Sequence, residues 1–382
     1  MDREAAQRPE QQSTRGRRHA RRVVSARILG HDPAVGTVGI LANPMSGRDV
    51  RRLAARASTT TLEIKRDQVS RAAIGAAAGG AKRLLVVAEP FRISTSAVEH
   101  LGLDIEIEVL DVGAELRASD TQRAVERMRE AGCGALIALG GDGTQRMVAK
   151  TWRDAPLVPL STGTNNVFPL HVEATAAGLA AGLVASARVP LAEASRPVKV
   201  VTAAIEGEPP DLALIDAALL VGDAVGNFMP FEPSRLRELV LARAEPAAVG
   251  MSPIGGLLLP CGDGDEFGVA VQCGAHESGG RALLAPISPG LFRTVHVLDV
   301  RRLAFGEAVT VEGPGVLAFD GDRERSLAPG QRATLTVARD GPRRIDVEGV
   351  LARAAREGAL VGRAHWRDAF DESFGGGGGD CC

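Results

Sequence analysis

Residues 135–154, ALIALGGDGTQRMVAKTWRD, decide the fold of this chain. The apolar run at 135–141 predicts a buried strand, and residues 144–154 have the apolar spacing of a helix. Three glycines and one aspartate lie around the junction. Because glycine tolerates positive φ and lets the backbone approach a ligand closely, this junction is either a tight turn or a loop that holds phosphate.

The same strand-to-helix pattern recurs on both sides of this segment. The first strand is expected in TVGILANP (37–44), so ordered sequence should begin near Gly36. Further strands are predicted at 83–89, 105–111 and 156–164, and helices at 46–57, 119–132 and 173–187. Alternating strands and helices with short connections predict a parallel sheet covered by helices on both faces.

The pattern changes after about residue 190. Short strands then follow one another, separated by Gly, Pro and Asp turns, and helices are expected only at 232–244 and 351–362. We therefore predict an α/β N-terminal domain with a parallel Rossmann-like sheet, followed by a mostly antiparallel β-sandwich C-terminal domain. The expected segments are a disordered tail (1–35), a nucleotide-binding α/β domain (36–192), a β-rich acceptor-side domain (195–348), a C-terminal helix returning to the body (349–370) and a flexible Gly/Cys tail (371–382).

Composition narrows the function classes. The formal net charge is −2, aromatic residues make up 3% and tyrosine is absent, so we expect no nucleic-acid partner. No apolar run is long enough for a membrane span. The five cysteines have no metal-binding spacing and the seven histidines form no cluster, which predicts free thiols, a reducing cytoplasmic compartment and no zinc.

Three Gly/Asn-rich strand ends should meet at one edge of the parallel sheet, where ligands of such sheets bind. They are residues 42–49, 140–145 and 161–169. The candidate nucleotide- and phosphate-binding residues are Asn43, Ser46, Gly47, Gly140, Gly141, Gly143, Thr144, Thr162, Gly163, Thr164, Asn165 and Asn166.

Asp142 is the unusual member of this group, because a carboxylate repels phosphate. It would hold Mg²⁺ or accept a proton from a hydroxyl nucleophile, or else simply cap the following helix. Thr144 could cap that helix too, with phosphate held by backbone N–H groups and by Arg48, Arg146 or Lys150. Asn165 and Asn166 suit a ribose or a base edge.

Taken together, these motifs resemble a known superfamily. GGDGT (140–144) is the signature of the NAD kinases and of the diacylglycerol and sphingosine lipid kinases. NPMSG (43–47), TGTNN (162–166) and GVLAFDGDRE (315–324) are similar to their other conserved segments. With ARAEPAAVGMSPIGG (242–256), the combination is most similar to the acetoin-catabolism protein X branch of the ATP-NAD kinase-like proteins, over about residues 36–350.

The resemblance implies a two-domain kinase with its active site between the domains. Asp142 would be the general base, the glycines and Thr144 would line the nucleotide phosphates, and Asp320 would face them from the β domain. Acceptor-side candidates are Asp216, Ser252, Gly255 and Asp320, and Mg²⁺ would be held through Asp142 or Asp320. This side departs from the NAD kinases, since Asp216 stands where they carry Asn-Glu, and Asp322 replaces a lipid-kinase Glu.

The function expected from these residues is ATP- and Mg²⁺-dependent phosphorylation of a hydroxyl of NAD or of a related nucleotide or polyol, linked to acetoin catabolism. One alternative is a lipid kinase, for which Leu257, Leu258 and Leu259 would supply part of an exposed apolar surface. Another is a nucleotide-binding accessory protein without catalysis. The sequence allows a homo-oligomer without specifying one.

Overall fold

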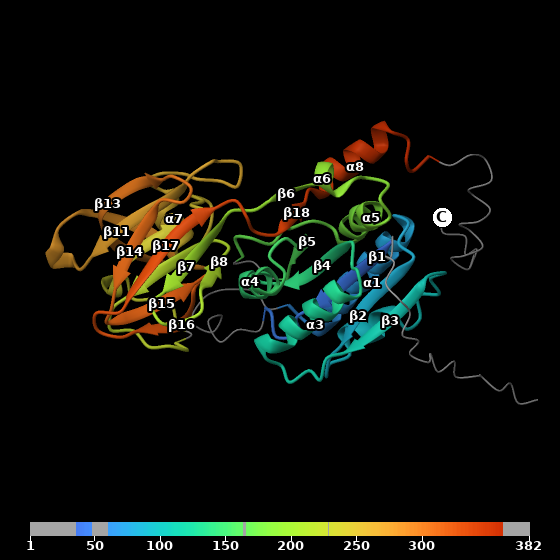
Figure 1. The fold of residues 1–382 in the computed structure, drawn as a ribbon, viewed down its shortest axis with the longest axis horizontal. Helices are drawn as coiled ribbons and strands as arrows, with labels where there is room; N and C mark the ends of the chain where they lie inside the picture. Colours follow the sequence, from blue (N-terminus) through green and yellow to red (C-terminus); the bar gives the residue numbers. More distant parts are fainter. Residues whose placement is uncertain (1–35, 48–59, 163–165, 228, 362–382) are drawn as a thin grey trace, which may run out of the picture. The chain divides into compact units, whose positions relative to one another are not determined.

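The GGDGT segment lies at the centre of a mixed seven-stranded sheet in the computed structural model, which describes residues 36–47, 60–162, 166–227 and 229–361 (Figure 1). The strand order is β3-β2-β1-β4-β5-β18-β6, with only β6 antiparallel to its neighbour. The bounds are β1 Thr37–Ala42, β2 Arg83–Ala88, β3 Glu106–Asp111, β4 Ala135–Gly140, β5 Pro156–Ser161, β6 Ser195–Pro197 and β18 Arg343–Ile345.

Helices cover both faces of this sheet, as the sequence predicts. Alternate strand residues belong to different apolar clusters: Ile40 and Leu84 pack with α1, α2, α5 and α8, whereas Leu41 and Leu85 pack with α3 and α4. The helices are α1 Leu62–Ala78, α2 Ile93–Val98, α3 Ala118–Glu130, α4 Asp142–Thr151, α5 Ala174–Ala185, α6 Leu191–Ala194 and α8 Val347–Arg356.

The remaining strands form two antiparallel sheets, ordered β12-β13-β11-β10-β9-β15-β16 and β14-β17-β7-β8. Val201 and Leu335 of the smaller sheet pack in one buried cluster with Ala217 and Leu317 of the larger, which confirms the predicted β-sandwich. The strands are β7 Val200–Ile205, β8 Asp211–Ala213, β9 Asp216–Leu220, β10 Leu236–Leu241, β11 Gly268–Gly274, β12 Arg281–Ser288, β13 Leu291–Leu303, β14 Ala308–Glu312, β15 Gly315–Phe319, β16 Asp322–Leu327 and β17 Arg332–Ala338; the short helix α7 is Ser252–Gly256.

The predicted helix at 232–244 is wrong. Pro233–Arg235 form one 3-10 turn, and β10 then runs between β9 and β11. Leu239 and Val240 belong to two different apolar clusters, so this strand is buried on both faces. A strand covered on both sides needs no alternation of apolar and polar residues, and its run of leucines and valine therefore imitates helical spacing.

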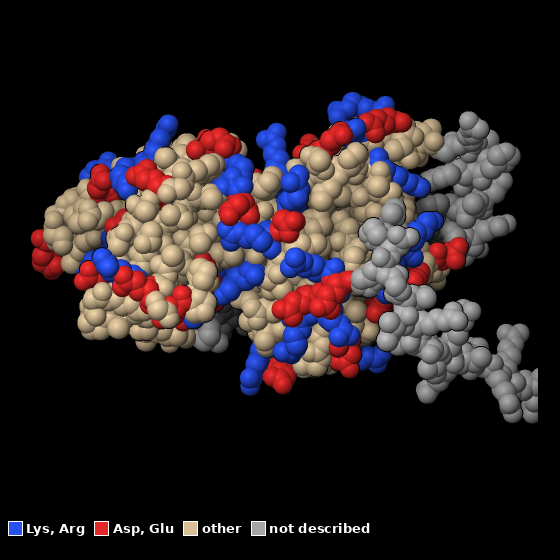
Figure 2. All heavy atoms as spheres, in the orientation of Figure 1, with Lys and Arg blue, Asp and Glu red and all other residues tan. Residues whose placement is uncertain are grey.

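The chain crosses twice between the α/β sheet and the sandwich. It leaves through β6 into β7 and returns from β17 into β18 and α8, and Val350 and Ala354 of α8 pack in the same cluster as Leu183 of α5. The predicted domain boundaries stay predictions, and the tails at 1–35 and 371–382 lie outside the described residues. Basic and acidic side chains are interspersed on the face shown in Figure 2.

Helices α1 and α5 approach closely because glycines face the partner backbone. A Cβ atom on Gly75 would lie 2.1 Å from the carbonyl oxygen of Thr175, and one on Gly178 would lie 2.1 Å from that of Ala72. Neither distance is sterically possible, so a side chain at either position forces the helices apart. The packing of α1 on α5 therefore depends on glycine.

Replacing Gly178 with alanine should lower the free energy of unfolding by about 1–3 kcal/mol, because overpacking a rigid contact strains both helices. Urea unfolding measures the change. Gly264→Ala is the matched control, since a Cβ atom there meets nothing within 4 Å. Equal unfolding midpoints for the two variants would contradict the packing described here.

Candidate functional site

The GGDGT loop turns directly from β4 into α4. Gly141 is the N-cap residue of α4 and makes no side-chain cap, and Thr144 lies inside the helix. The prediction that Thr144 caps the helix is therefore wrong; its Oγ1 accepts a hydrogen bond from Asn43 Nδ2 at 2.8 Å. Gly140 is needed for this packing, because a Cβ atom there would lie 2.4 Å from Cβ of Thr144.

The Asp142 carboxylate is turned toward the loop after β5. It accepts backbone N–H hydrogen bonds from Phe168 at 2.9 Å and from Val167 at 3.2 Å. Burial raises the pKa of Asp142 to about 7; the Asp320 carboxylate raises it further, while the two N–H donors and Arg243 oppose the shift. Asp142 therefore does not cap α4, because its side chain binds the loop after β5 and not the N-terminus of its own helix.

The first and third strand ends meet beside this loop. Ser46 Oγ donates to Asn43 O at 2.8 Å and accepts from Thr162 Oγ1 at 2.8 Å. Gly47 has φ of +74°, and Asn166 Nδ2 donates to Ser161 Oγ at 2.9 Å. The structure thus brings the three predicted strand ends together, while Gly163, Thr164, Asn165 and Arg48 lie outside the described residues.

Lys65 supports the first of these loops and was missed from the sequence. Its side chain is fully buried, and its Nζ donates to the carbonyl oxygens of Asn43, Pro44 and Ser46 at 2.6–2.9 Å. The available signal was its rarity, because the chain holds only four lysines. The ammonium fixes the backbone of the NPMSG segment.

Asp320 reaches the site from the sandwich. It occupies the turn between β15 and β16 with φ of +49°, and it accepts the N–H groups of Leu214, Ile215 and Asp216 at 2.8–3.2 Å. Burial raises the pKa of Asp320 to about 6 against the opposing effect of Arg146 and these donors. The N–H groups come from the point where the chain passes from β8 in one sheet to β9 in the other.

Asp216 is a buried aspartate at the start of β9. It is 5% exposed, and its Oδ1 has no hydrogen-bond partner among the described residues. Burial raises the pKa of Asp216 well above its ordinary range, and the charges of Asp320, Asp142 and Asp322 raise it further. Asp322 also approaches α4, since its Oδ2 lies 3.1 Å from the position of a Cβ on Gly143. Asp322 thus brings the start of β16 next to the GGDGT loop.

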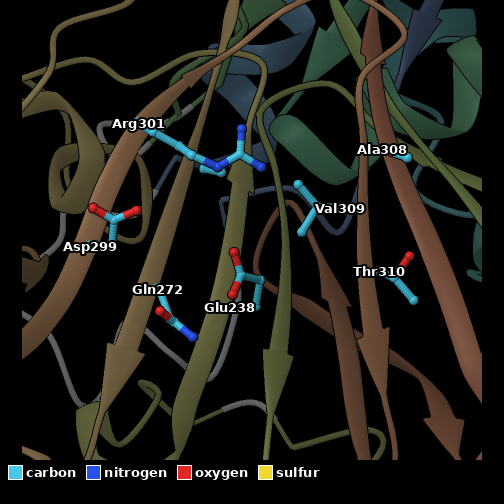
Figure 3. A pocket seen from close by; sticks show the side chains of 8 residues that line it. Glu238, Gln272, Asp299, Arg301, Ala308, Val309 and Thr310 are labelled. Atoms are coloured by element: carbon cyan, nitrogen blue, oxygen red, sulfur yellow. The ribbon is translucent and has the colours of Figure 1, made fainter.

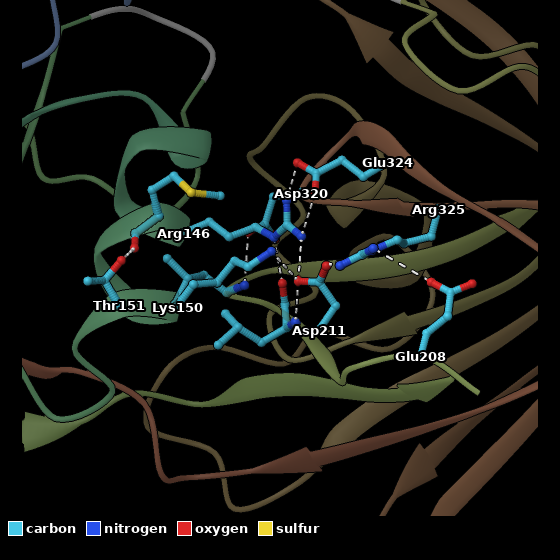
Figure 4. A network of polar contacts seen from close by, with 11 residues as sticks. Arg146, Lys150, Thr151, Glu208, Asp211, Asp320, Glu324 and Arg325 are labelled. Atoms are coloured by element: carbon cyan, nitrogen blue, oxygen red, sulfur yellow. Dashed lines mark hydrogen bonds and ion pairs between the residues drawn. The ribbon is translucent and has the colours of Figure 1, made fainter. Parts of the chain in front are cut away.

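Arg146 on α4 joins the two regions through buried charges (Figure 4). It is 1% exposed; its Nη2 donates to Asp211 Oδ1 at 2.8 Å and its Nη1 to Glu324 Oε1 at 2.6 Å. Lys150 Nζ lies 2.8 Å from the same Asp211 oxygen. Both cations are thus bound to carboxylates in this structure, and their predicted contact with phosphate stays a prediction.

Arg243 is a second cation that the sequence did not single out. Its guanidinium lies 5.9 Å from the ring centroid of Phe168 and binds Glu245, while its buried Nη1 has no partner among the described residues. Of the predicted acceptor-side residues, Ser252 Oγ donates to Arg243 O at 2.8 Å. A Cβ atom on Gly255 would lie 2.3 Å from Leu241 Cδ1, so that glycine seats α7 against β10.

The three leucines proposed for a lipid surface divide between two environments. Leu257 is 44% exposed, whereas Leu258 and Leu259 pack against the buried cluster that holds Met251 and Ile254. No helix in the described part of the chain is long and apolar enough to cross a membrane. Within the same residues, no three His, Cys, Asp or Glu side chains converge as a metal-ligand set.

The sandwich carries a separate hollow of about 280 Å³ that sequence reasoning did not anticipate (Figure 3). Glu238 of β10, Gln272 of β11, and Asp299 and Arg301 of β13 lie along it. Burial raises the pKa of Glu238 to about 7; Arg301 opposes the shift and Asp299 adds to it. The hollow thus has charges of both signs and a carboxyl group that ionises near neutral pH.

A parallel α/β region with GGDGT at a central strand end, joined to an antiparallel sandwich, defines an NAD kinase-like protein. Residues 38–187 match the ATP-NAD kinase N-terminal domain, and residues 199–340 match the acetoin catabolism protein X C-terminal domain. The chain is 36% identical to acetoin catabolism protein X of Cupriavidus necator over 332 residues, which are 84% of this chain and 92% of that protein. It belongs to the acetoin catabolism protein X family.

Solved structures of NAD and NADH kinases also resemble the fold. Yeast NADH kinase complexed with NADH superposes with a TM-score of 0.47 at 12% identity, covering 86% of this chain and 89% of that chain. An NAD kinase from Archaeoglobus fulgidus in complex with ATP has a TM-score of 0.36 at 14% identity, covering 73% of this chain and 99% of that chain.

Replacing Arg146 with methionine should destabilise the protein by about 3–5 kcal/mol, because it leaves the buried Asp211 without its closest guanidinium partner. Urea unfolding provides the measurement. Arg325→Met is the control: Arg325 binds the same carboxylate at 3.2 Å from a side chain that is 33% exposed, so its loss should cost clearly less. An equal decrease in the free energy of unfolding for both variants would show that the burial of Arg146 does not determine its contribution to stability.

Replacing Asp216 with asparagine should stabilise the protein more at pH 8 than at pH 5. A carboxyl whose folded-state pKa is raised contributes stability below its ordinary value of 3.8, and that stability is lost as pH rises toward the folded-state pKa. Asparagine stays neutral and avoids this loss. Urea midpoints at pH 5, 6, 7 and 8 test the trend, with exposed Asp154→Asn as the control. A gain that does not depend on pH would refute it.

Proposed function

We propose that this chain is an ATP-dependent small-molecule kinase in which Asp142 accepts the proton of the acceptor hydroxyl. The observation that carries the proposal is the Asp142 carboxyl group, whose pKa is raised to about 7 while backbone N–H groups hold it in place. A general base works best when its pKa lies near the working pH. The hydroxyl oxygen then attacks the terminal phosphorus, the bond to the ADP oxygen breaks, and the hydroxyl proton passes to Asp142.

ATP is the proposed donor because the N-terminal region matches an ATP-NAD kinase domain. The first turn of α4 leaves backbone N–H groups without partners inside the helix, and such groups bind phosphate. Gly140, Gly141 and Gly143, with Asn43, Ser46, Gly47, Thr144, Thr162 and Asn166, are the proposed donor-side residues, together with the undescribed Gly163, Thr164 and Asn165.

Mg²⁺ is the proposed metal. It commonly binds to substrate phosphates and one or two carboxylates, so it needs no complete ligand set from the protein. The partnerless Oδ1 of Asp216 fits a site that gains a cation or a donor group with its substrates. Asp142 or Asp320 would hold the ion, which would neutralise charge on the phosphoryl group.

The proposed acceptor is a hydroxyl of NAD or of a related nucleotide or polyol. The carboxyl groups of Asp216 and Asp320 approach the site from the sandwich, and carboxyl groups are suitable hydrogen-bond partners for hydroxyls. The name of the Cupriavidus relative supports a role connected with acetoin catabolism. We place the reaction in the cytoplasm, where thiols such as the buried Cys133, Cys261 and Cys273 stay reduced.

Asp142→Asn should lower turnover by about 10²–10⁴-fold, the usual contribution of a positioned general base, while ATP binding is retained. The wild-type rate should rise with pH through an apparent pKa near 7, because only ionised Asp142 accepts the proton. The assay incubates the protein with ATP, Mg²⁺ and NAD, then with a metabolite extract, and detects phosphorylated products by mass spectrometry. Asp154→Asn, beyond the end of α4, should keep full activity.

Three results would overturn this assignment. Normal turnover by Asp142→Asn would remove the role of that carboxylate. Phosphorylation of diacylglycerol vesicles in place of soluble acceptors would favour the lipid-kinase alternative. ATP binding without phosphorylation of any acceptor would favour the accessory-protein alternative.

A further inference from the structure

A lysine and a cysteine outside the proposed active site lie in direct contact inside the sandwich. Lys199 Nζ donates to Cys261 Sγ at 3.0 Å, and both side chains are fully buried. Lys199 Nζ also donates to Phe267 O at 3.0 Å, and Cys261 Sγ donates to the same oxygen at 3.1 Å. Two nucleophilic atoms are thus held together by a shared carbonyl acceptor.

The surroundings of this pair are unusual for a buried ammonium group. Among the described residues, no carboxylate lies within ion-pair distance of Lys199 Nζ; its neighbours are the thiol, the carbonyl and, at 6.0 Å, the ring centroid of Phe267. Buried lysines are normally paired with an acid. The structure therefore gives Lys199 no ion-pair role that would account for its burial.

The loop that follows Cys261 contacts the pair through Phe267 O and reaches the protein surface. Gly264, Asp265 and Glu266, in the loop between Cys261 and β11, are exposed. Arg344 binds Asp263 at 2.7 Å in that loop, and Arg339 donates to Asp265 O at 2.9 Å. Lys199 lies on the outgoing crossing between β6 and β7, and Arg339 and Arg344 lie on the returning one. The loop therefore contacts both connections between the α/β sheet and the sandwich.

We propose that Lys199 and Cys261 are an oxidative crosslinking site, in which hydrogen peroxide joins Sγ to Nζ. The sulfur attacks one peroxide oxygen, which gives a sulfenic acid and one water molecule. The amine lone pair then attacks sulfur, the sulfenic oxygen leaves as a second water molecule, and an S–N bond forms. The two side chains together lose two hydrogen atoms, peroxide is reduced to water, and any additional ammonium proton passes to solvent.

The bond would covalently link the β6–β7 connection to the loop that follows Cys261. That loop also contacts the β17–β18 connection through Arg339 and Arg344. Because an S–N bond of this kind is reduced by thiols, the link is reversible. Cys133 is the internal comparison: it is also buried, but its Sγ donates to Ala135 O and accepts from Gly39 N, both backbone groups. Burial raises the pKa of both thiols, and a lysine opposes this rise at Cys261 whereas backbone N–H and C=O contacts oppose it at Cys133.

Peptide mapping of the full chain tests the crosslink. Folded protein and protein unfolded in urea are treated with hydrogen peroxide, alkylated, and digested with trypsin and a protease that cuts at Asp. The folded sample should yield one peptide pair containing Lys199 and Cys261, two hydrogen masses below the sum, with tryptic cleavage after Lys199 lost. The pair should be at least about tenfold more abundant than in urea, because the contact exists only in the folded chain. Dithiothreitol should remove it.

Cys261→Ser and Lys199→Met should each abolish the crosslinked peptide, and Cys133 should form none. The peptide that carries Cys381 and Cys382 reports that the oxidant acted. The proposal is overturned if that peptide is oxidised while Cys261 is recovered as free thiol or sulfinic acid and cleavage after Lys199 is intact. It is equally overturned if the crosslink forms as readily in urea. The wild-type comparison decides the matter even if a variant fails to fold.

Discussion

The buried guanidinium of Arg146 is the interaction on which the arrangement of the site depends. Arg146 stands four residues after Asp142 on α4, and its partners Asp211 and Glu324 belong to strands of the two sandwich sheets. A fully buried charge tolerates little displacement, since each lost hydrogen bond leaves a charged group in a poorly solvating interior. The helix that presents Asp142 is thereby held in register with the strands that flank the Asp320 turn.

Three aspartates near this contact have carboxyl groups that are costly to ionise. Burial raises the pKa of Asp142, Asp216 and Asp320; the charge of Asp320 adds to the rise for the other two, while Arg243 opposes it at Asp142 and Arg146 opposes it at Asp320. Such a group of carboxyls holds protons near neutral pH and gains stability when a cation or a hydrogen-bonding substrate arrives. The raised pKa values of these carboxyl groups underlie both the proposed proton transfer and the predicted pH dependence of the free energy of unfolding.

Two kinds of polar burial therefore coexist in the chain. Around Arg146 the charges are matched, and Lys65 is satisfied by three carbonyl groups. Lys199 differs, because its nearest side-chain partner is the thiol of Cys261. Buried charges that have hydrogen-bond partners stabilise the fold. The contact of a buried amine with a thiol instead brings two reactive atoms together, which is the basis of the proposed crosslink.

The sequence by itself determined the fold class and the edge of the sheet where the site lies. Parallel strands buried on both faces read as continuous apolar runs, and their carboxyl ends share one edge, so residues 42–49, 140–145 and 161–169 could be brought together without coordinates. The motif also singled out Asp142. The strand β10 was mistaken for a helix, because a strand covered on both faces loses the alternation that distinguishes it.

Only the tertiary structure decided what each charged side chain does. Arg146 looked like a phosphate ligand because it follows a glycine-rich loop, but its partners lie 65 and 178 residues away along the chain. The Lys199–Cys261 contact joins residues 62 apart, and Asp142 is held by N–H groups 25 and 26 residues away. A charge takes its role from the groups that replace its water, and only folding brings those groups into contact.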